Sequence, residues 1–510
     1  MNKRILVAAV ALVLVASVSV AVYFSFKSND VFSQLDDEDT SQEALEETKL
    51  TFYFQGNEPG DTKEVLEQVE EKSKNRLKAN LDFKFIQNSE DYLGEIRSII
   101  ASGQPCDAFF FSDYFPQGLR NLVREDVIKD ITGLFPKYAP SYYKYFSSEE
   151  LRTATVEGKI YAIPNHMPTA QTLSAIVRTD LMEKYGIPEI KNYEDFEVYL
   201  KAVKQNQPEV IPMTFYESVM GLFSWINGYV MLDYSQGLVY RQDDPGMKVI
   251  AWESTSEFKK GIETIRRWYK EGYLSNGSIR PIDEASISSG SFASFISTYD
   301  AEYQYNTMLK NRQIEWRYKA YPLSDKISLR NSPLNGAMLI NSKSDNTERV
   351  LMFVEWLQSN QENYDSLMYG IKDKHYTLAD NWLKLPDNVD AGELSLSWAW
   401  RWPFTNIDYE RPDSKSAEDY KKAYIDLINT KTQYPRHLGF VADFSPVRDL
   451  VDFRRSAFFS MEQNIHAGYL TPEDIDTYIK DQKSEGIGTI IAEVQSQLDK
   501  WASENKSNDQ

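Results

Sequence analysis

The chain has very few cysteines and histidines. It contains one cysteine, Cys106, so no disulfide can form within the chain, and the fold must depend on its hydrophobic core. Cys106 directly precedes a predicted strand, and we expect it to be buried. The four histidines lie far apart in the sequence, and no HExxH or CxxC spacing occurs. We therefore predict no metal site and no zinc enzyme.

Several catalytic motifs are also missing. The patterns GxSxG, GxxxxGK[ST] and GxGxxG do not occur, so acyl transfer, nucleotide hydrolysis and dinucleotide chemistry lack their usual markers. We expect no cofactor. With 76 acidic residues, some pair of carboxylates will lie near any cleft, so a glycosidase hypothesis has no specific support in the sequence.

Positive charge is scarce as well. There are 56 lysines and arginines against the 76 acidic residues, which gives a net charge of -20 and a pI near 4.8. Because binding to a phosphate backbone needs a basic surface, we expect no nucleic-acid partner.

Charged residues are absent from residues 5–26, an apolar stretch that follows Lys3 and Arg4. A basic start followed by an apolar core is typical of an export segment. The stretch is also long enough to cross a bilayer as a helix, which needs about 20 residues. Two interpretations stay open, namely cleavage after Ala21 as a signal peptide or retention of residues 1–27 as a membrane anchor. We favour retention, with the two basic residues on the cytoplasmic side and the body outside.

Residues 28–49 are rich in acidic side chains and have few apolar ones. We expect a solvated, self-repelling tether in this region. A calcium-binding loop is not favoured, because no glycine occupies the sharp-turn position of such a loop. Beyond the tether, apolar runs alternate with turns as far as Trp501, and 42% of the chain is hydrophobic. The body is therefore globular and long enough for two domains.

The first part of the body alternates strand and helix patterns. Residues 50–54, 81–86 and 107–111 have strand patterns, and residues at helical spacing lie between them. Asp61 and Glu64 form a capping-box pattern at the start of the first helix. The order βαβαβ predicts a parallel sheet.

In an open α/β sheet, ligands lie beyond the carboxyl ends of the strands. The loop that follows the strand DAFFF is therefore the first candidate site, and it contains Ser112, Asp113, Tyr114 and Phe115.

Further strand and helix signals occur later in the chain. Residues 335–341 have a strand pattern, and Asn346 is placed to cap the helix that follows. Helix-rich sequence with isolated strands fills residues 193–317, which indicates a second α/β lobe. Thr471 and Pro472 open another helix near the end of the chain.

Aromatic residues make up 13% of the chain, and three of them alternate in one short segment. Trp398, Trp400 and Trp402 lie in the sequence SWAWRWPF, and alternate residues of an extended segment share one face. Three indoles on one face would form a platform for sugar rings, with Arg401 as a polar neighbour. The other interpretation is an ordinary buried strand whose indoles pack against helices.

Four stretches of the body, taken together and in their order along the chain, resemble the sequences of a single protein family. They are ATVEGKIYAIPN at 154–165, SGSFASFISTYDAEYQ at 289–304, the segment 336–376 that begins GAMLINSKSDNTERV, and GFVADFSPV at 439–447. Together they resemble the extracellular solute-binding proteins of bacterial ABC importers. The resemblance is to the long, lipoprotein-like carbohydrate subfamily with a conserved C-terminal region.

The resemblance implies an α/β fold of the type II periplasmic-binding-protein kind. Such a fold has two lobes joined by a hinge, with a ligand cleft between the lobes. Residues 50–164 and about 334–376 would form the first lobe. Residues 165–333 and about 377–510 would form the second, helix-rich lobe.

The function that the resemblance implies is capture without catalysis. The ligand would be a carbohydrate, most simply an oligosaccharide, and hinge closure would prepare it for delivery to the transmembrane subunits of an ABC permease. The protein would work as a monomer at the outer face of the cytoplasmic membrane.

The resemblance also implies a set of ligand-binding residues. Asp113 and Tyr114 belong to the loop after DAFFF, Asn165 lies at the edge of the hinge, and Tyr299 and Asp300 lie in the second of the four stretches. The remaining candidates would line the second lobe, and they are Trp225, Trp398, Trp400, Arg401 and Trp402. For Trp225 an equally good interpretation is that it is a core aromatic residue carried by a helix. An acidic glycan would need cationic partners, for which Arg178, Arg401 and Lys372 are the candidates.

Two alternative functions remain open at this point, a secreted carbohydrate-active enzyme and a ligand sensor that partners a membrane kinase. The sequence also departs from the family in two respects. Lys372 and Asp373 stand where members commonly have Glu and Gly. Members usually carry a cysteine just after the signal core, which is lipidated, and no cysteine follows Phe26 here. A lipid anchor at that place is excluded, so the apolar segment itself is the anchor that the sequence provides.

We predict that the N-terminal segment is retained. Mass spectrometry of the mature chain from the membrane fraction is expected to detect peptides from residues 1–27. A mature chain that begins at Val22 would contradict retention and would make the protein freely secreted.

Overall fold

The computed structural model describes residues 45–87, 91–115, 118–168, 170–215, 219–274, 284–325, 328–379, 381–386 and 398–506. The predicted export segment and most of the predicted tether lie outside these ranges. Within them, no helix combines the length and the apolar character that crossing a bilayer requires.

The predicted parallel arrangement of the first three strands is confirmed. Strand β1 (Thr48–Gln55) pairs in parallel with β2 (Ala79–Ile86) on one side and with β3 (Ala108–Phe111) on the other. Strands β16 (Ala337–Ile340) and β6 (Ala162–Ile163) complete a sheet of order β2-β1-β3-β16-β6. Because β16 runs antiparallel to β3, the start of β16 lies at the same sheet edge as the end of β3.

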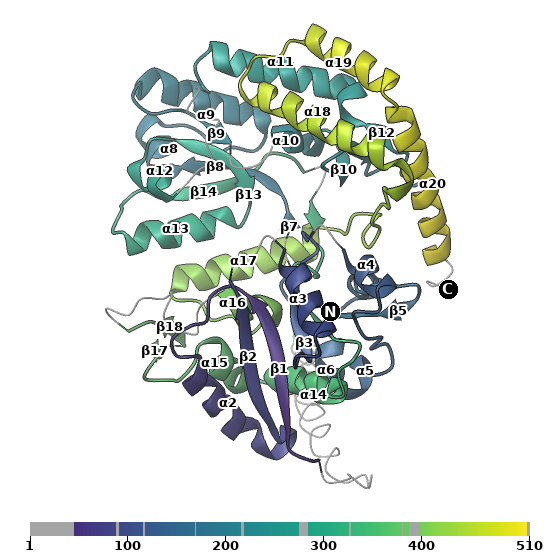
Figure 1. The fold of residues 1–510 in the computed structure, drawn as a ribbon. Coiled ribbons are helices and arrows are strands. Elements are labelled where there is room, and N and C mark those ends of the chain that lie inside the picture. The colour runs from purple at the N-terminus through teal and green to yellow at the C-terminus, as the bar shows by residue number, and fades with distance from the viewer. Residues whose placement is uncertain are drawn as a thin grey trace, which may run out of the picture. The chain divides into compact units, whose positions relative to one another are not determined.

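Helices surround this first sheet. Helix α2 (Thr62–Leu77) contacts α14 (Thr347–Leu357) and α15 (Gln361–Met368). Helix α16 (Trp398–Phe404) contacts β1, β3 and β16, and Figure 1 shows it where β1 and β2 finish. The other elements of this part are α3 (Tyr92–Ala101), α4 (Leu119–Arg124), α5 (Phe135–Tyr138), α6 (Pro140–Tyr143), α7 (Ser148–Thr153), β4 (Thr155–Val156), β5 (Lys159–Ile160), β17 (Thr377–Ala379) and β18 (Trp382–Lys384).

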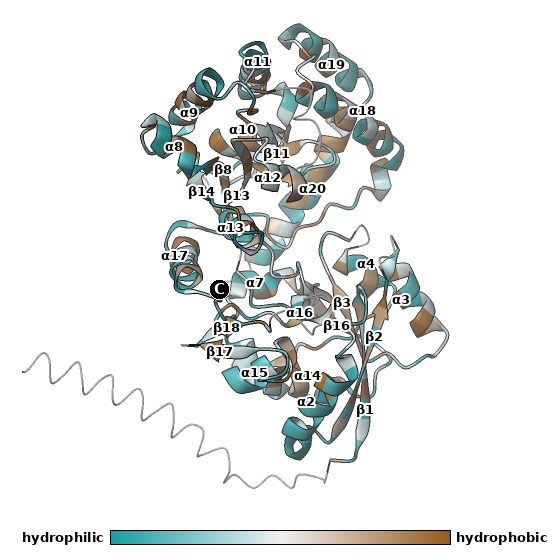
Figure 2. Cartoon of the chain, turned by 90° about the vertical axis from the view of Figure 1, so that its left-hand side faces the viewer, coloured by the Kyte–Doolittle hydropathy of each residue, from teal (hydrophilic) through white to brown (hydrophobic). Residues whose placement is uncertain are grey.

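The core of the first sheet is largely aromatic. The rings of Phe52 and Phe54 in β1 lie 6.3 and 6.0 Å from the ring of Phe404 in α16. Cys106 is buried in the same core, as predicted. In Figure 2 the brown, hydrophobic colour gathers in the sheet strands, while α2 and α15 are largely teal. Strands with two buried faces and amphipathic covering helices are what a parallel sheet of this kind requires.

A second sheet has the order β14-β8-β13-β9. Strand β8 (Leu173–Arg178) pairs antiparallel with β14 (Tyr318–Pro322) and β13 (Ser294–Thr298), and β13 pairs in parallel with β9 (Thr214–Phe215). Around it lie α8 (Thr179–Tyr185), α9 (Tyr193–Asn206), α10 (Val219–Ile226), α11 (Ser256–Lys270), α12 (Glu284–Ser289) and α13 (Ala301–Asn311), and a small sheet of β10 (Tyr229–Asp233), β11 (Leu238–Arg241) and β12 (Ile250–Ala251).

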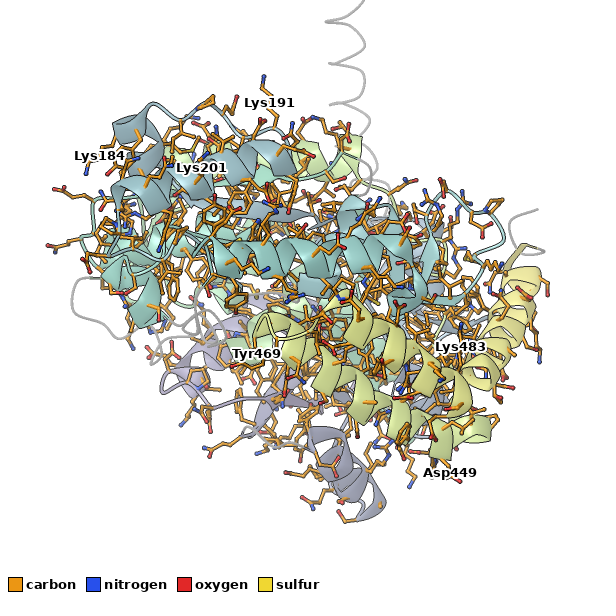
Figure 3. The ribbon with its side chains drawn as sticks, turned by 90° about the horizontal axis from the view of Figure 1, so that it is seen from above. Lys184, Lys191, Lys201, Asp449, Tyr469 and Lys483 are labelled. Atoms are coloured by element: carbon orange, nitrogen blue, oxygen red, sulfur yellow. The ribbon has the colours of Figure 1, made fainter. Side chains whose placement is uncertain are left out.

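Three helices at the end of the chain pack on the core of the second sheet. They are α18 (Arg448–His466), α19 (Pro472–Ser484) and α20 (Ile487–Lys506), and short 3-10 turns lie at η1 (Trp252–Ser254) and η4 (Ser445–Val447). Figure 3 labels charged side chains on two of these helices, Asp449 on α18 and Lys483 on α19.

Segments that connect the two sheets lie side by side. Strand β7 (Ala170–Gln171) pairs antiparallel with β15 (Leu329–Arg330), and Gln433 forms a parallel bridge to Leu329. Helix α17 (Lys415–Lys431) leads into that bridge, and the hydroxyl of its Tyr424 accepts a hydrogen bond from the Ala170 amide. Strands β7 and β15 lie near the lobe boundaries predicted at residues 164–165 and 333–334. The passage at Gln433 lies well beyond the third boundary, which was predicted near residue 376.

The lobe boundaries stay a prediction, but one part of them is corrected. Residues 377–510 were assigned to the second lobe, whereas Ala399, Trp400 and Phe404 of α16 are buried in the core of the first sheet. The physical reason is that α16 fills the aromatic end of that core, between β1 and β16.

Helix caps follow the sequence patterns only in part. Thr471 starts α19 with a complete capping box, as expected. The capping box predicted for Asp61 does not form, because its carboxylate faces His375 at 3.5 Å and makes no cap hydrogen bond. Asn346 precedes α14 as predicted, yet its side chain bonds to Thr48 and Asp107 instead of capping the helix.

A buried ion pair joins α18 to the 3-10 turn η1. Arg454 of α18 lies 2.6 Å from Glu253, and their side chains are 1% and 2% exposed. The guanidinium also donates to the Gln236 carbonyl, to the Tyr478 hydroxyl and to the Gln482 amide oxygen. Nearly all its donors therefore have partners, as a buried charge requires.

We predict that Glu253→Gln lowers the free energy of unfolding by about 3 kcal/mol, because the Arg454 charge is left buried without its counter-ion. Urea denaturation followed by far-ultraviolet circular dichroism measures this. Asp243→Asn is the matched control, since it breaks an Arg241–Asp243 pair at 2.9 Å that is exposed to solvent. Equal midpoints for both variants would contradict the prediction.

Candidate functional site

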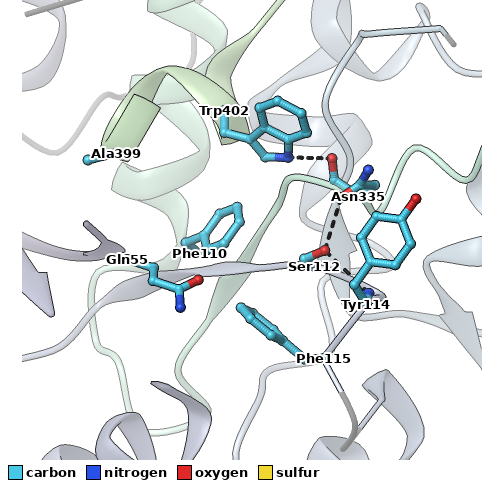
Figure 4. Close-up of a pocket in the computed structure, with 8 residues that line it drawn as sticks. All are labelled: Gln55, Phe110, Ser112, Tyr114, Phe115, Asn335, Ala399 and Trp402. Carbon is cyan, nitrogen blue, oxygen red and sulfur yellow. Dashed lines mark hydrogen bonds between the residues drawn. The ribbon is translucent and has the colours of Figure 1, made fainter. Parts of the chain in front are cut away.

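A pocket lies at the edge of the first sheet where its parallel strands end. It is lined by Gln55, Phe110, Ser112, Tyr114, Phe115, Asn335, Ala399 and Trp402. Its volume is about 330 Å³, which lies within the range of small-ligand pockets, about 300–1,000 Å³. Figure 4 shows side chains from four separate parts of the chain around the same space.

The topology of the sheet explains why these parts meet. Gln55 is the last residue of β1, and Ser112 directly follows β3. Asn335 comes just before β16, whose start lies at that same edge because it runs antiparallel to β3. The position agrees with the expected crevice beyond the carboxyl ends of the strands.

Hydrogen bonds hold one wall of the pocket in place. The Ser112 hydroxyl donates to the side-chain oxygen of Asn335 at 3.0 Å and accepts from the Tyr114 amide at 3.3 Å. The indole N–H of Trp402 donates to the Asn335 carbonyl at 2.6 Å, as Figure 4 shows. Trp402 therefore presents a ring whose orientation is set by the turn before β16.

Aromatic rings form the opposite wall. The Phe115 ring lies 5.9 Å from that of Phe110 in an edge-on arrangement and 5.6 Å from that of Tyr92, on which it is stacked. The hydroxyl of Tyr92 donates to the Tyr53 carbonyl in β1, so this wall is tied to the sheet. Stacked and edge-on rings of this kind provide flat apolar surface with little freedom to move.

Two glycines let α16 approach the sheet edge. Gly336 has φ +121°, and a Cβ there would lie 2.3 Å from Cδ1 of Trp402. Gly56 has φ +135°, and a Cβ there would lie 3.3 Å from that of Ala399. Because both backbone conformations are in regions that glycine alone adopts readily, no other residue fits these positions without strain.

Two predicted site residues belong to the loop after β3. Tyr114 lines the pocket, and 73% of its side chain is exposed. Asp113 also has an exposed side chain, yet surrounding protein atoms remove part of its hydration. This loss of hydration raises the pKa of the Asp113 carboxyl above its ordinary value, and a hydrogen bond from Ser332 offsets part of the rise.

Asn165 lies behind the pocket and not in it. Its side-chain amide donates to the Trp402 carbonyl at 3.2 Å and to the Asn335 carbonyl at 3.4 Å. Only 4% of Asn165 is exposed, so in this conformation it positions pocket residues and offers little surface to a ligand.

The prediction that the three tryptophans lie on an extended segment is wrong. Residues 398–404 form the helix α16, in which residues two apart point in nearly opposite directions. Trp402 faces the pocket, whereas Trp400 is 0% exposed and packs on the Phe83 ring at 5.5 Å. The core interpretation therefore holds for Trp400, and a three-indole platform is excluded. The Trp398 side chain lies outside the described part of the structure.

Arg401 is directed away from the pocket. Its guanidinium pairs with Glu410 at 2.9 Å and lies 5.1 Å from the centre of the Tyr369 ring. Tyr369 also donates to Glu410, so the ion pair belongs to a buried network behind α16. Arg401, which was predicted as a polar neighbour of a ligand, thus forms contacts that hold α16 in place.

The other predicted residues lie in the second half of the fold. Trp225 of α10 is buried in the core of the second sheet. Tyr299 stacks on Tyr420 and Tyr424 of α17 at 6.1 and 6.0 Å, and Asp300 accepts a hydrogen bond from Gln304. None of the three lines the pocket, and a ligand contact for Tyr299 or Asp300 stays a prediction.

Gln55, Phe110, Asn335 and Ala399 line the pocket but were not predicted from the sequence. Gln55 could have been found, because it ends the first parallel strand and the rule for strand ends applies to it as well. Asn335 could not, because its place at this edge depends on the direction of β16.

No group of three or more His, Cys, Asp or Glu side chains in the described ranges is arranged to hold a metal ion. The pocket instead combines aromatic faces with neutral amide and hydroxyl groups. The chain forms two sheets with surrounding helices, adjacent connections between the sheets, and a pocket at a sheet edge. These features define a ligand-binding protein of the two-lobe α/β class.

The chain belongs to the bacterial extracellular solute-binding protein family, whose model matches residues 58–364. A carbohydrate ABC transporter substrate-binding protein from Streptococcus pneumoniae serotype 4 is 23% identical over 474 residues, which cover 90% of this chain and 91% of that protein. The family resemblance expected from the sequence is confirmed.

Solved structures show the same fold. The N-glycan transport solute binding protein NgtS from Streptococcus pneumoniae has a TM-score of 0.73 at 20% identity, covering 90% of this chain and 99% of that chain. The HMO binding ABC-transporter associated solute binding protein from Bifidobacterium longum infantis has a TM-score of 0.64 at 14% identity, covering 89% and 99%. The predicted two-lobe α/β fold class is thereby confirmed.

We predict that Gly336→Ala destabilises the protein by about 2 kcal/mol or more and displaces the Trp402 indole, because the new methyl group overlaps that ring. Urea denaturation and intrinsic tryptophan fluorescence measure the two effects. Gly158→Ala is the matched control, since Gly158 has φ +77° but nothing within 4 Å of the added Cβ. It should cost only the backbone penalty of about 1 kcal/mol and leave the fluorescence unchanged.

An equal loss of stability in both variants, with unchanged fluorescence in both, would show that Gly336 is needed for its backbone conformation alone.

Proposed function

We propose that this chain is the extracytoplasmic binding subunit of an ABC importer and that it captures an oligosaccharide through the pocket at the edge of the first sheet. The observation that carries the proposal is the composition of that pocket. The faces of Phe110, Phe115 and Trp402 stand beside the amides of Gln55 and Asn335. Flat apolar surface suits the C–H faces of sugar rings, and amide groups can pair with their hydroxyls.

The relatives support the same substrate class. The pneumococcal relative is a carbohydrate transporter component, and the similar solved structures include NgtS in complex with Man1GlcNAc and with Man5GlcNAc. We extend the oligosaccharide class to the present chain on the basis of the pocket. A screen of sugars can identify which oligosaccharide binds.

Binding without turnover is part of the proposal. Glycoside hydrolysis ordinarily uses two carboxyl groups that flank the bond to be cleaved. The residues that line the pocket include no carboxylate, and the nearest one in the chain is Asp113, between Ser112 and Tyr114. This composition favours a binding protein over the alternative of a carbohydrate-active enzyme.

Closure of the two lobes would add the second wall of the site. The paired strands β7 and β15 and the bridge at Gln433 are the connections that would bend. Asp300 and Tyr299, on the second sheet side of those connections, are the residues that we propose reach the ligand after closure. We further propose that residues 1–27 hold the protein, as a monomer, at the membrane near the permease.

We predict that a neutral oligosaccharide raises the midpoint of thermal unfolding without being cleaved. A ligand at 100 times its dissociation constant should add about 2.7 kcal/mol of stability. A thermal-shift screen of neutral oligosaccharides, followed by chromatography of the sugars after incubation, measures both effects. Release of shorter sugars would overturn the binding-protein assignment, and the absence of any shift would overturn the carbohydrate assignment.

Two tyrosines provide a matched pair of variants for the site itself. Tyr114 lines the pocket with 73% of its side chain exposed, and Tyr469 is 68% exposed on the surface shown in Figure 3. We predict that Tyr114→Ala weakens binding of the sugar by about tenfold or more, which is 1.4 kcal/mol, since an aromatic contact is lost. Tyr469→Ala should leave the dissociation constant unchanged in titration calorimetry. Equal affinities in both variants would place the ligand elsewhere.

A further inference from the structure

The pocket offers a ligand only neutral hydrogen-bonding groups. Among the lining residues these groups are the amides of Gln55 and Asn335 and the hydroxyls of Ser112 and Tyr114. An amide or a hydroxyl can pair with a sugar hydroxyl, but it cannot neutralise a carboxylate that has lost its water.

The carboxylate nearest in the chain to the pocket wall is that of Asp113, which we call the rim charge. Asp113 stands between two lining residues, in surroundings that remove part of its hydration. The connection after β1 carries Glu58, whereas the Asp61 carboxylate faces His375 at 3.5 Å. Neither residues 55–61 nor residues 112–118 include a lysine or an arginine, and residues 331–336 before β16 include none either.

The arginines that could have met an acidic sugar are committed elsewhere. Arg401, next to Trp402 in the chain, pairs with Glu410 at 2.9 Å. Arg178 pairs with Asp180 at 2.7 Å, and Arg330, close to Asn335 in the chain, lies 3.6 Å from Glu150. Each of these guanidiniums is drawn towards a carboxylate that is not part of the pocket.

The remaining cations near the site in sequence do not line it. Lys372 lies on an exposed turn between α15 and β17. Arg120 and Arg124 are on α4, where Arg124 donates to Asn121 and lies 3.8 Å from Asp443. None of these residues is among those that form the pocket wall.

We propose that the pocket selects neutral sugar units and rejects units that carry a carboxylate, such as uronic or sialic acids. This selectivity rests on the proposed function and deepens it. A carboxylate entering the site would exchange its water for aromatic faces and amides, with Asp113 as a like charge beside two lining residues and no cation among the residues that line the pocket. A hydroxymethyl group at the same place loses far less hydration and finds amide partners.

Sugar pairs that differ only in charge provide the test. The full chain is titrated with β-1,4-mannotriose and β-1,4-trimannuronate, and with lacto-N-neotetraose and its sialylated form, at one ionic strength. The neutral member of a pair is expected to bind at least tenfold more tightly than the acidic member. An acidic member that binds as tightly or more tightly would overturn the selectivity and leave the proposed function standing. If none of the four sugars binds, both are overturned.

A charge variant locates the origin of the selectivity. Asp113→Asn removes the rim charge and keeps a hydrogen-bond acceptor, so the ratio of neutral to acidic affinity should fall severalfold. Asp449→Asn is the control, because Asp449 is an exposed carboxylate on α18, labelled in Figure 3 and absent from the pocket wall. The ratio of neutral to acidic affinity in the Asp449→Asn variant should match that of the unaltered protein. The same ratio in both variants would overturn the role of Asp113.

Discussion

The position of α16 depends on the absence of side chains at two turns. The helix rests against the backbone at Gly56 and Gly336, and at Gly336 a single added carbon would stand 2.3 Å from the Trp402 ring. The pocket is the space beside this contact, between Trp402 and the aromatic wall that follows β3. A side chain at either glycine would therefore press directly on a residue that lines the pocket, on Trp402 from Gly336 and on Ala399 from Gly56, and would alter the shape of the pocket.

A half-buried ion pair holds α16 from its other side. Glu410 accepts from both Arg401 and Tyr369, and this satisfies a carboxylate that would otherwise be costly to bury. The chain between Arg401 and Glu410 also bonds to the connection between the sheets. The His166 amide donates to the Thr405 carbonyl, and the Ile407 amide donates to the His166 carbonyl. Bending at that connection would thus be transmitted to α16 and to the pocket wall.

The sequence predicted the features that arise from local pattern. Period-two and helical spacing located β1, β2 and α3, and the rule for strand ends selected the loop whose Tyr114 lines the pocket. It did not predict Asn335, because nothing local shows that β16 runs antiparallel to β3. Nor could it show that Arg401 was already paired, since Glu410 becomes its partner only through the turn after α16.

The tryptophans of α16 show why spacing alone was misleading. Alternation at every second residue suggested a strand with one aromatic face, but Pro403 and the tight contact at Gly336 are compatible with a short helix. In that helix Trp400 turns into the core and Trp402 turns to the pocket. The core contacts of Trp400 with Phe83 and Phe85 fix the rotation of α16 about its axis. The ring that a ligand would meet is therefore oriented by a neighbour two residues away that no ligand can reach.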